Sequence, residues 1–110
     1  MASKVKINNG KIMDGSKTVG MLKNGRIYDG NVVGRNHLLA MTRNDFIYNR
    51  NTVGSNYCIG MVKNGTIYNR NTVSSNHKVG TIRDAERVIY GSCSDAELGA
   101  IYILMKSGKI

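Results

Sequence analysis

The chain has 110 residues, of which 16 are lysine or arginine and 7 are aspartate or glutamate, giving a formal net charge of +9. This length supports one hydrophobic core but not two, and the lack of proline together with 13 glycines favours tight turns over long helices. No apolar run is long enough to span a membrane and no apolar signal segment opens the sequence, so we expect a cytoplasmic protein without a membrane partner.

A stretch of eight residues recurs along the chain and predicts its main structural element. It reads Met-Leu-Lys-Asn-Gly-Arg-Ile-Tyr at 21–28, begins again at Met41 and Met61, and has a divergent copy that begins at Thr81. Its Asn-Gly pair suits a type I′ turn, in which both central residues take a positive φ. Each copy therefore predicts a β-hairpin, and together they predict an all-β fold of repeated hairpins with a period of about 20 residues.

The two-residue turn also predicts which side chains share a face. It pairs Met21 with Tyr28 and Leu22 with Ile27, and strand alternation then places Leu22 and Ile27 on one face, with Met21, Lys23 and Tyr28 on the other. The isoleucine position is kept in every copy, and we expect these residues to form the core: Ile12, Ile27, Ile47, Ile67 and Ile89.

The copies differ in length, and their period of about 20 residues suits a closed ring, an open sheet or a solenoid coil. The interval from Ile12 to Ile27 is shorter than the next two, because the later copies carry extra residues around 50–54 and 70–74. Second turns are predicted at 34–36, 54–56 and 74–76. This spacing is typical of a meander or flower-like array of hairpins, while a solenoid coil is the alternative.

The last part of the chain changes in character. The copy that begins at Thr81 has lost its Asn-Gly pair, as expected of a terminal copy that is no longer a standard hairpin. Ser94 and Glu97 then fit a capping box, and an apolar segment follows. We predict a buried apolar helix over residues 94–106, with a final strand through 101–104 as the alternative. The hairpin repeats would occupy residues 7–91 of a single domain, 1–110.

Several short motifs resemble a known family. They are Ile12-Met13-Asp14-Gly15, Val19-Gly20-Met21-Leu22, Ile27-Tyr28-Asp29-Gly30 and Val79-Gly80-Thr81-Ile82. This pattern resembles the small bacterial repeat proteins called four-fold β-flower proteins, which also tend to end in an apolar, alanine-rich helix. The resemblance covers most of the chain and implies an all-β repeat fold without an established activity.

Two sets of residues are candidates for binding a ligand. Cations can hold phosphates and aromatic rings can stack on bases or sugars. The first set shares one face of the hairpins and consists of Lys23, Arg43, Lys63, Tyr28, Tyr48 and Tyr68. The second set follows the hairpins and consists of Arg50 and Arg70. The structural alternative, which we favour for the tyrosines, is cross-strand packing of each tyrosine on a methionine.

Other reactive residues form no recognisable site. His37 and His77 occupy equivalent positions, but two imidazoles without further ligands do not make a metal centre. Asp14 and Asp29 are interpreted as turn residues. Cys58 and Cys93 are expected to be free thiols, with one disulfide as the alternative. No nucleophile and base motif and no phosphate loop is present, so we expect neither catalysis nor a cofactor.

We therefore expect a non-enzymatic scaffold or protein-interaction module whose partner is another protein or a second copy of the chain. The net charge of +9 also admits an acidic partner. One alternative is therefore a module that binds nucleic acid or another polyanion through the lysine, arginine and tyrosine rows. A second alternative is a carbohydrate-binding module in which the tyrosines stack on sugars.

Overall fold

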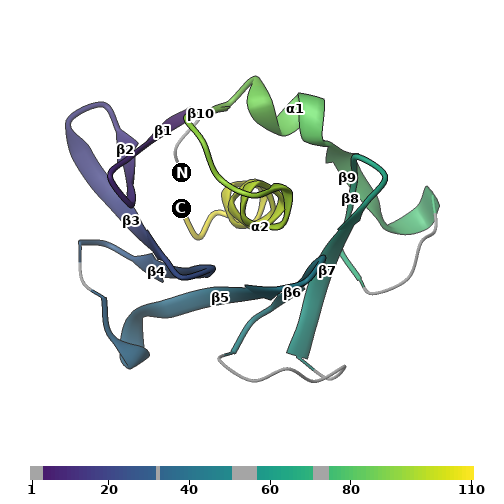
Figure 1. Cartoon of the computed structure of the whole chain (residues 1–110), viewed down its shortest axis with the longest axis horizontal. Helices are drawn as coiled ribbons and strands as arrows, with labels where there is room; N and C mark the ends of the chain where they lie inside the picture. Colours follow the sequence, from purple (N-terminus) through teal and green to yellow (C-terminus); the bar gives the residue numbers. More distant parts are fainter. Residues whose placement is uncertain (1–3, 32, 51–56, 71–74) are drawn as a thin grey trace.

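A ten-stranded sheet curls around one central helix (Figure 1). The computed structural model describes residues 4–31, 33–50, 57–70 and 75–110. The strands are β1 Val5–Asn8, β2 Lys11–Asp14, β3 Lys17–Lys23, β4 Arg26–Asp29, β5 Leu38–Arg43, β6 Phe46–Tyr48, β7 Cys58–Lys63, β8 Thr66–Tyr68, β9 Lys78–Thr81 and β10 Ile89–Tyr90. The helices are α1 Ile82–Glu86 and α2 Asp95–Lys106, with short 3-10 segments at Arg35–His37 and Ser75–His77.

The strands form an antiparallel meander, so a solenoid coil is not the architecture of this chain. Strands β1 to β9 lie in sequence order, and β10 joins the sheet by a parallel pairing with β1. The predicted hairpin register is confirmed by the pairs Met21 with Tyr28, Met41 with Tyr48 and Met61 with Tyr68. The predicted turn at 54–56 lies outside the described residues.

The Asn-Gly turns take the predicted backbone conformation and are hydrogen-bonded to the element that follows each hairpin. Asn24 has φ 51° and Gly25 has φ 77°, as a type I′ turn requires. The carbonyl oxygen of Gly25 then accepts a hydrogen bond from the backbone N–H of Thr42 in the next hairpin, at 2.8 Å. Gly65 accepts in the same way from Ile82, also at 2.8 Å. The turn at Gly25 is therefore tied to the next hairpin, and the turn at Gly65 is tied to the first residue of α1.

A bulge between neighbouring hairpins bends the sheet into a ring. Ile27 pairs with Ala40 but Tyr28 pairs with Leu38, so one residue of β5 is left without a partner. The same shift occurs after Ile47 and after Ile67. A bulge bends its strand and increases the local twist, and bulges at corresponding points therefore curl the sheet in one direction.

The ring is not closed by strand pairing. Helix α1 lies between β9 and β10, at the point where the two ends of the sheet approach each other (Figure 1). Thr81 caps α1 in a capping box with Asp84, in which each residue's side chain accepts from the other's backbone N–H. The sequence predicted the loss of the hairpin here but not a helix in its place.

The isoleucine positions form the core, as predicted. Ile12, Ile27, Ile47 and Ile67 have no exposed surface and Ile89 has 2%, and they cluster with Ile101 and Leu104 of α2. Each of the first four lies opposite a small residue on the neighbouring strand: Gly20, Ala40, Gly60 and Gly80. Small partners leave room for the isoleucine side chains and for the helix inside the ring.

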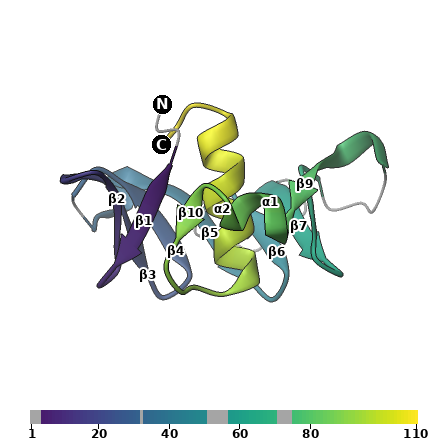
Figure 2. The ribbon, with the colours of Figure 1, turned by 90° about the horizontal axis from the view of Figure 1, so that it is seen from above.

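Helix α2 confirms the predicted C-terminal helix and rules out a final strand in its place. Ser94 caps it: its hydroxyl oxygen accepts from the N–H of Glu97 at 3.1 Å, and its own N–H donates to Oε1 of Glu97 at 2.9 Å. The helix runs through the ring, and its C-terminal end projects beyond the strands (Figure 2). The start of the sheet was predicted too late, because β1 begins at Val5, which is buried and pairs with Ile89.

Candidate functional site

One face of the sheet is basic. Since the core isoleucines face α2, the residues that alternate with them face outward. Every basic residue of the strands except Lys17 occupies such an outward position. Arg26 is half-buried, and the exposed ones are Lys6, Lys11, Lys23, Arg43, Lys63 and Lys78. No acidic residue occupies an outward position within the described strands, and we call this surface the basic outer face.

The first predicted row of cations lies together on this face. Lys23, Arg43 and Lys63 are the last residues of β3, β5 and β7, and all three are exposed. They are therefore separated by one intervening strand each, which corresponds to a spacing of roughly 10 Å along the ring. A chain-like ligand that crosses the strands would meet a cation at every second strand.

The tyrosines of the predicted row pack on methionines rather than standing free. Tyr48 is 7% exposed and its cross-strand partner Met41 is 6% exposed. Tyr28 and Tyr68 are half-buried. Tyr48 is therefore closed to a stacking ligand, in line with the packing interpretation, while Tyr90 at the edge of the sheet is 46% exposed.

The second predicted row, Arg50 and Arg70, lies apart from the first. Both follow the strands at the end away from the hairpin turns, and both are exposed. The guanidinium carbon of Arg50 lies 5.0 Å from the centre of the Tyr57 ring, a cation–π contact. The structure thus separates the two predicted basic rows to opposite ends of the strands.

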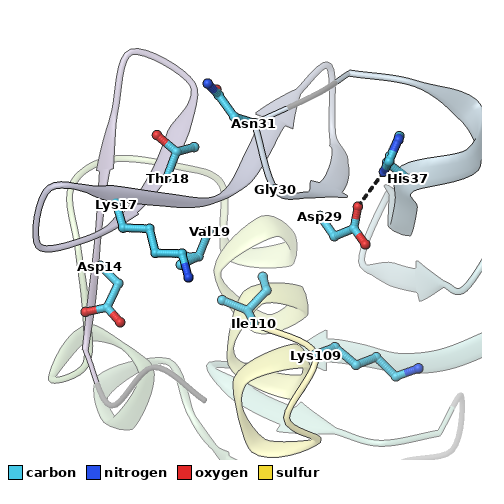
Figure 3. Close-up of a pocket in the computed structure, with 10 residues that line it drawn as sticks. All are labelled: Asp14, Lys17, Thr18, Val19, Asp29, Gly30, Asn31, His37, Lys109 and Ile110. Atoms are coloured by element: carbon cyan, nitrogen blue, oxygen red, sulfur yellow. Dashed lines mark hydrogen bonds and ion pairs between the residues drawn. The ribbon is translucent and has the colours of Figure 1, made fainter.

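A cavity opens at the end of the ring where residues 14, 17–19, 29–31, 37 and 109–110 meet, and we call it the mouth cavity (Figure 3). Helix α2 packs mainly on β5, β6, β7 and α1, and so leaves space on the side of β2 to β4. The cavity has a volume of about 570 Å³ and is lined by Asp14, Lys17, Thr18, Val19, Asp29, Gly30, Asn31, His37, Lys109 and Ile110.

The sequence did not identify this cavity. Nδ1 of His37 lies 2.9 Å from Oδ1 of Asp29, with both side chains about half exposed (46% and 51%). The sequence feature that could have indicated the cavity is the Asp-Gly pair at 14–15 and 29–30, which is replaced by Asn-Arg in the later copies. The described ranges contain no group of three or more metal-binding side chains, around His37 and His77 or elsewhere.

The two cysteines are free thiols, as expected. The Sγ–H of Cys58 donates to the carbonyl oxygen of Gly60 at 3.3 Å. Burial raises the pKa of Cys93 to about 11, with smaller contributions from the negative charges of Glu97 and Asp95. A thiol with a raised pKa is a poor nucleophile at neutral pH, so Cys93 does not have the character of a catalytic cysteine.

Compared with models of protein families, with curated proteins and with solved structures, the chain matches none of them. In the part of the chain that the structure describes, no helix is both long enough and apolar enough to cross a membrane. The basic outer face and the mouth cavity are the features of the described residues on which we base a function.

Proposed function

We propose that the chain is a non-enzymatic module of repeated β-hairpins, of the four-fold β-flower type, that binds nucleic acid through its basic outer face. The observation that carries the proposal is the segregation of charge: the outward positions of the described strands hold lysines and arginines and no carboxylate. A scaffold that only needed solubility would gain it equally from mixed charges. A surface of one sign instead favours a partner of the opposite sign.

The arrangement of the cations supports a polymer rather than a single ion. Lys23, Arg43 and Lys63 end alternate strands around the ring and do not converge on one point. A compact anion would reach one of them, whereas a phosphate backbone laid across the strands reaches all three. Binding of this kind is driven by release of counterions and is independent of sequence.

The packing of the tyrosines favours nucleic acid held by its backbone over the carbohydrate alternative. Recognition of sugars or bases by stacking needs an exposed aromatic face. Tyr48 is buried against Met41, and Tyr28 and Tyr68 present only part of their rings. We therefore expect phosphate contacts to dominate, with little contribution from stacking.

Fluorescence anisotropy of short labelled single-stranded DNA and RNA, titrated between about 50 and 200 mM salt, tests the proposal. If three cations contact phosphates, log K should fall against log salt with a slope of roughly −2. The triple variant K23Q/R43Q/K63Q should bind at least roughly tenfold more weakly and lose most of this slope. Double-stranded DNA serves as a comparison ligand.

The matched control is K17Q/K106Q/K109Q, which removes the same charge from positions off the basic outer face. Lys17 and Lys109 line the mouth cavity, and the ammonium of Lys106 lies 5.2 Å from the centre of the Tyr102 ring. This control should retain nearly all of the affinity. An equal loss in both triple variants would show that only net charge matters, and the absence of binding at the lowest salt would refute the proposal. Salt-independent binding of a neutral glycan would favour the carbohydrate alternative.

A further inference from the structure

We infer that the mouth cavity binds a small zwitterion of the α-amino acid class, with an ammonium and a carboxylate group on a short apolar body. The site is separate from the basic outer face, and the inference does not depend on nucleic-acid binding. It is carried by the juxtaposition of unpaired charges of both signs around an apolar floor in one cavity.

The cavity exists because the first copy is short. A tight turn at Gly15, with φ +65°, joins β2 directly to β3. The connection from β4 to β5 is longer and includes the 3-10 segment Arg35–His37. The tight turn therefore places no loop over this side of the ring, and α2 packs against the opposite side, on β5 to β7 and α1. Ile110, which is 7% exposed, and the half-buried Val19 form an apolar floor.

Charges of both signs surround this floor (Figure 3). Asp14 and Lys17 are cross-strand partners on one wall, and Lys109 comes from the segment after α2. Within the described ranges, none of these three side chains makes an ion pair. On the other wall, Asp29 contacts Nδ1 of His37 through Oδ1, so this contact orients the carboxylate without using Oδ2.

This combination selects a ligand by charge. An anion without an amine would face both Asp14 and Asp29, and a cation without a carboxylate would face Lys17 and Lys109. A zwitterion places its ammonium near the aspartates and its carboxylate near a lysine, so that both charges of the ligand are paired. A short aliphatic side chain would cover the apolar floor. A cavity of about 570 Å³ is within the range of small-molecule sites.

Because the walls are open to water, the charge pairs are individually weak, and we expect dissociation constants on the order of 1 mM. Titration of the ¹⁵N-labelled protein at neutral pH and constant ionic strength compares three probes. They are leucine, 4-methylpentanoate, which lacks the ammonium, and 3-methylbutylamine, which lacks the carboxylate. Leucine should shift the amides of residues 14–19, 29–31 and 109–110 and bind at least roughly fivefold more tightly than either analogue.

Variants assign the contacts. D14N and K17Q should each weaken leucine binding at least roughly fivefold, while K23Q, which makes the same change as K17Q on the basic outer face, should leave it unchanged. D29N tests the second wall, and the amide spectrum of each variant reports whether it is folded.

The inference is overturned by any of three results. One is the absence of saturable shifts at these amides up to about 50 mM leucine, far above the expected dissociation constant. Another is an analogue that binds as tightly as leucine. The third is an unchanged leucine affinity in folded D14N and K17Q. None of these results bears on nucleic-acid binding, which is measured separately on the K23Q/R43Q/K63Q variant.

Discussion

A Cβ atom on Gly99 of α2 would lie 2.5 Å from Cγ2 of Val62 in β7. Glycine inside a helix normally lowers stability by about 1 kcal/mol relative to alanine. Here the missing side chain lets the helix approach the inner face of the sheet, where Val62 is 4% exposed. Gly60 does the same from the sheet side, since its Cβ would lie 2.5 Å from Cδ1 of Ile103. The position of α2 inside the ring thus depends on glycines on both surfaces.

Gly99→Ala should destabilise the protein although alanine is the better helix former. Overpacking costs about 1–3 kcal/mol and is partly offset by about 1 kcal/mol of helix propensity, so we expect a net loss of up to about 2 kcal/mol in the free energy of unfolding, measured by urea denaturation. Val62→Ala removes the clashing methyl group. In that background Gly99→Ala should be neutral or stabilising, and equal effects in both backgrounds would contradict the proposed contact.

Tyr48→Ala should lower the stability of the protein without removing a cation of the basic outer face. Its ring is buried against Met41, so truncation should lower the free energy of unfolding by about 3 kcal/mol. Tyr48→Phe keeps the ring and should stay within about 0.5 kcal/mol of the parent protein. Nucleic-acid affinity of the folded Tyr48→Phe variant should be unchanged. A loss of affinity in that variant would assign Tyr48 a role in binding.

Asp84 should titrate at lower pH than an ordinary aspartate. The backbone N–H and the side chain of Thr81 lower its pKa below 3.8, with smaller contributions from Arg87 and Lys78. A lowered pKa means that the carboxylate stabilises the fold above pH 3.8 and that this stability is lost as the pH falls through the folded-state value. Carboxyl ¹³C NMR measures the pKa directly. Thr81→Ala should raise it, and an unchanged value would show that the cap hydroxyl has no part in the shift.

Cys93 should react slowly with iodoacetamide. The rise of its pKa from 9.0 to about 11 lowers the thiolate fraction below pH 9.0 by roughly 100-fold, and alkylation follows the thiolate. Peptide mapping after timed alkylation gives the rate at Cys93, and the urea-unfolded chain is the control in which the slowing should disappear. Asp95→Asn should restore only a small part of the rate because burial is the largest cause of the shift. A rate in the folded protein equal to that in urea would contradict the raised pKa.

The raised pKa of Cys93 also predicts how the stability of the protein changes at alkaline pH. A thiol with a higher pKa in the folded state contributes stability below pH 9.0, and loses it as the pH rises toward about 11. The parent protein should therefore lose more stability than Cys93→Ala across this interval. Comparison of urea midpoints for the two proteins at several pH values removes the effect of the other groups that titrate there.

The sequence by itself determined the local structure. Asn-Gly pairs specify the turns, a two-residue turn specifies the register, and alternation along each strand then selects Ile27, Ile47 and Ile67 for the core. The Ser94 capping box likewise marks the start of α2. These features were predictable because each depends on residues that are close in sequence.

Only the tertiary structure decided what the residues do together. The burial of Tyr48 and the exposure of Lys23 on the same face depend on the packing of side chains from neighbouring strands around a bent sheet. The mouth cavity joins Asp14, Asp29 and Lys109, which are far apart in the chain, because bulges curl the sheet and α2 leans to one side. Curvature accumulates over many strands, and turn residues and strand alternation, which act over a few positions, do not specify it.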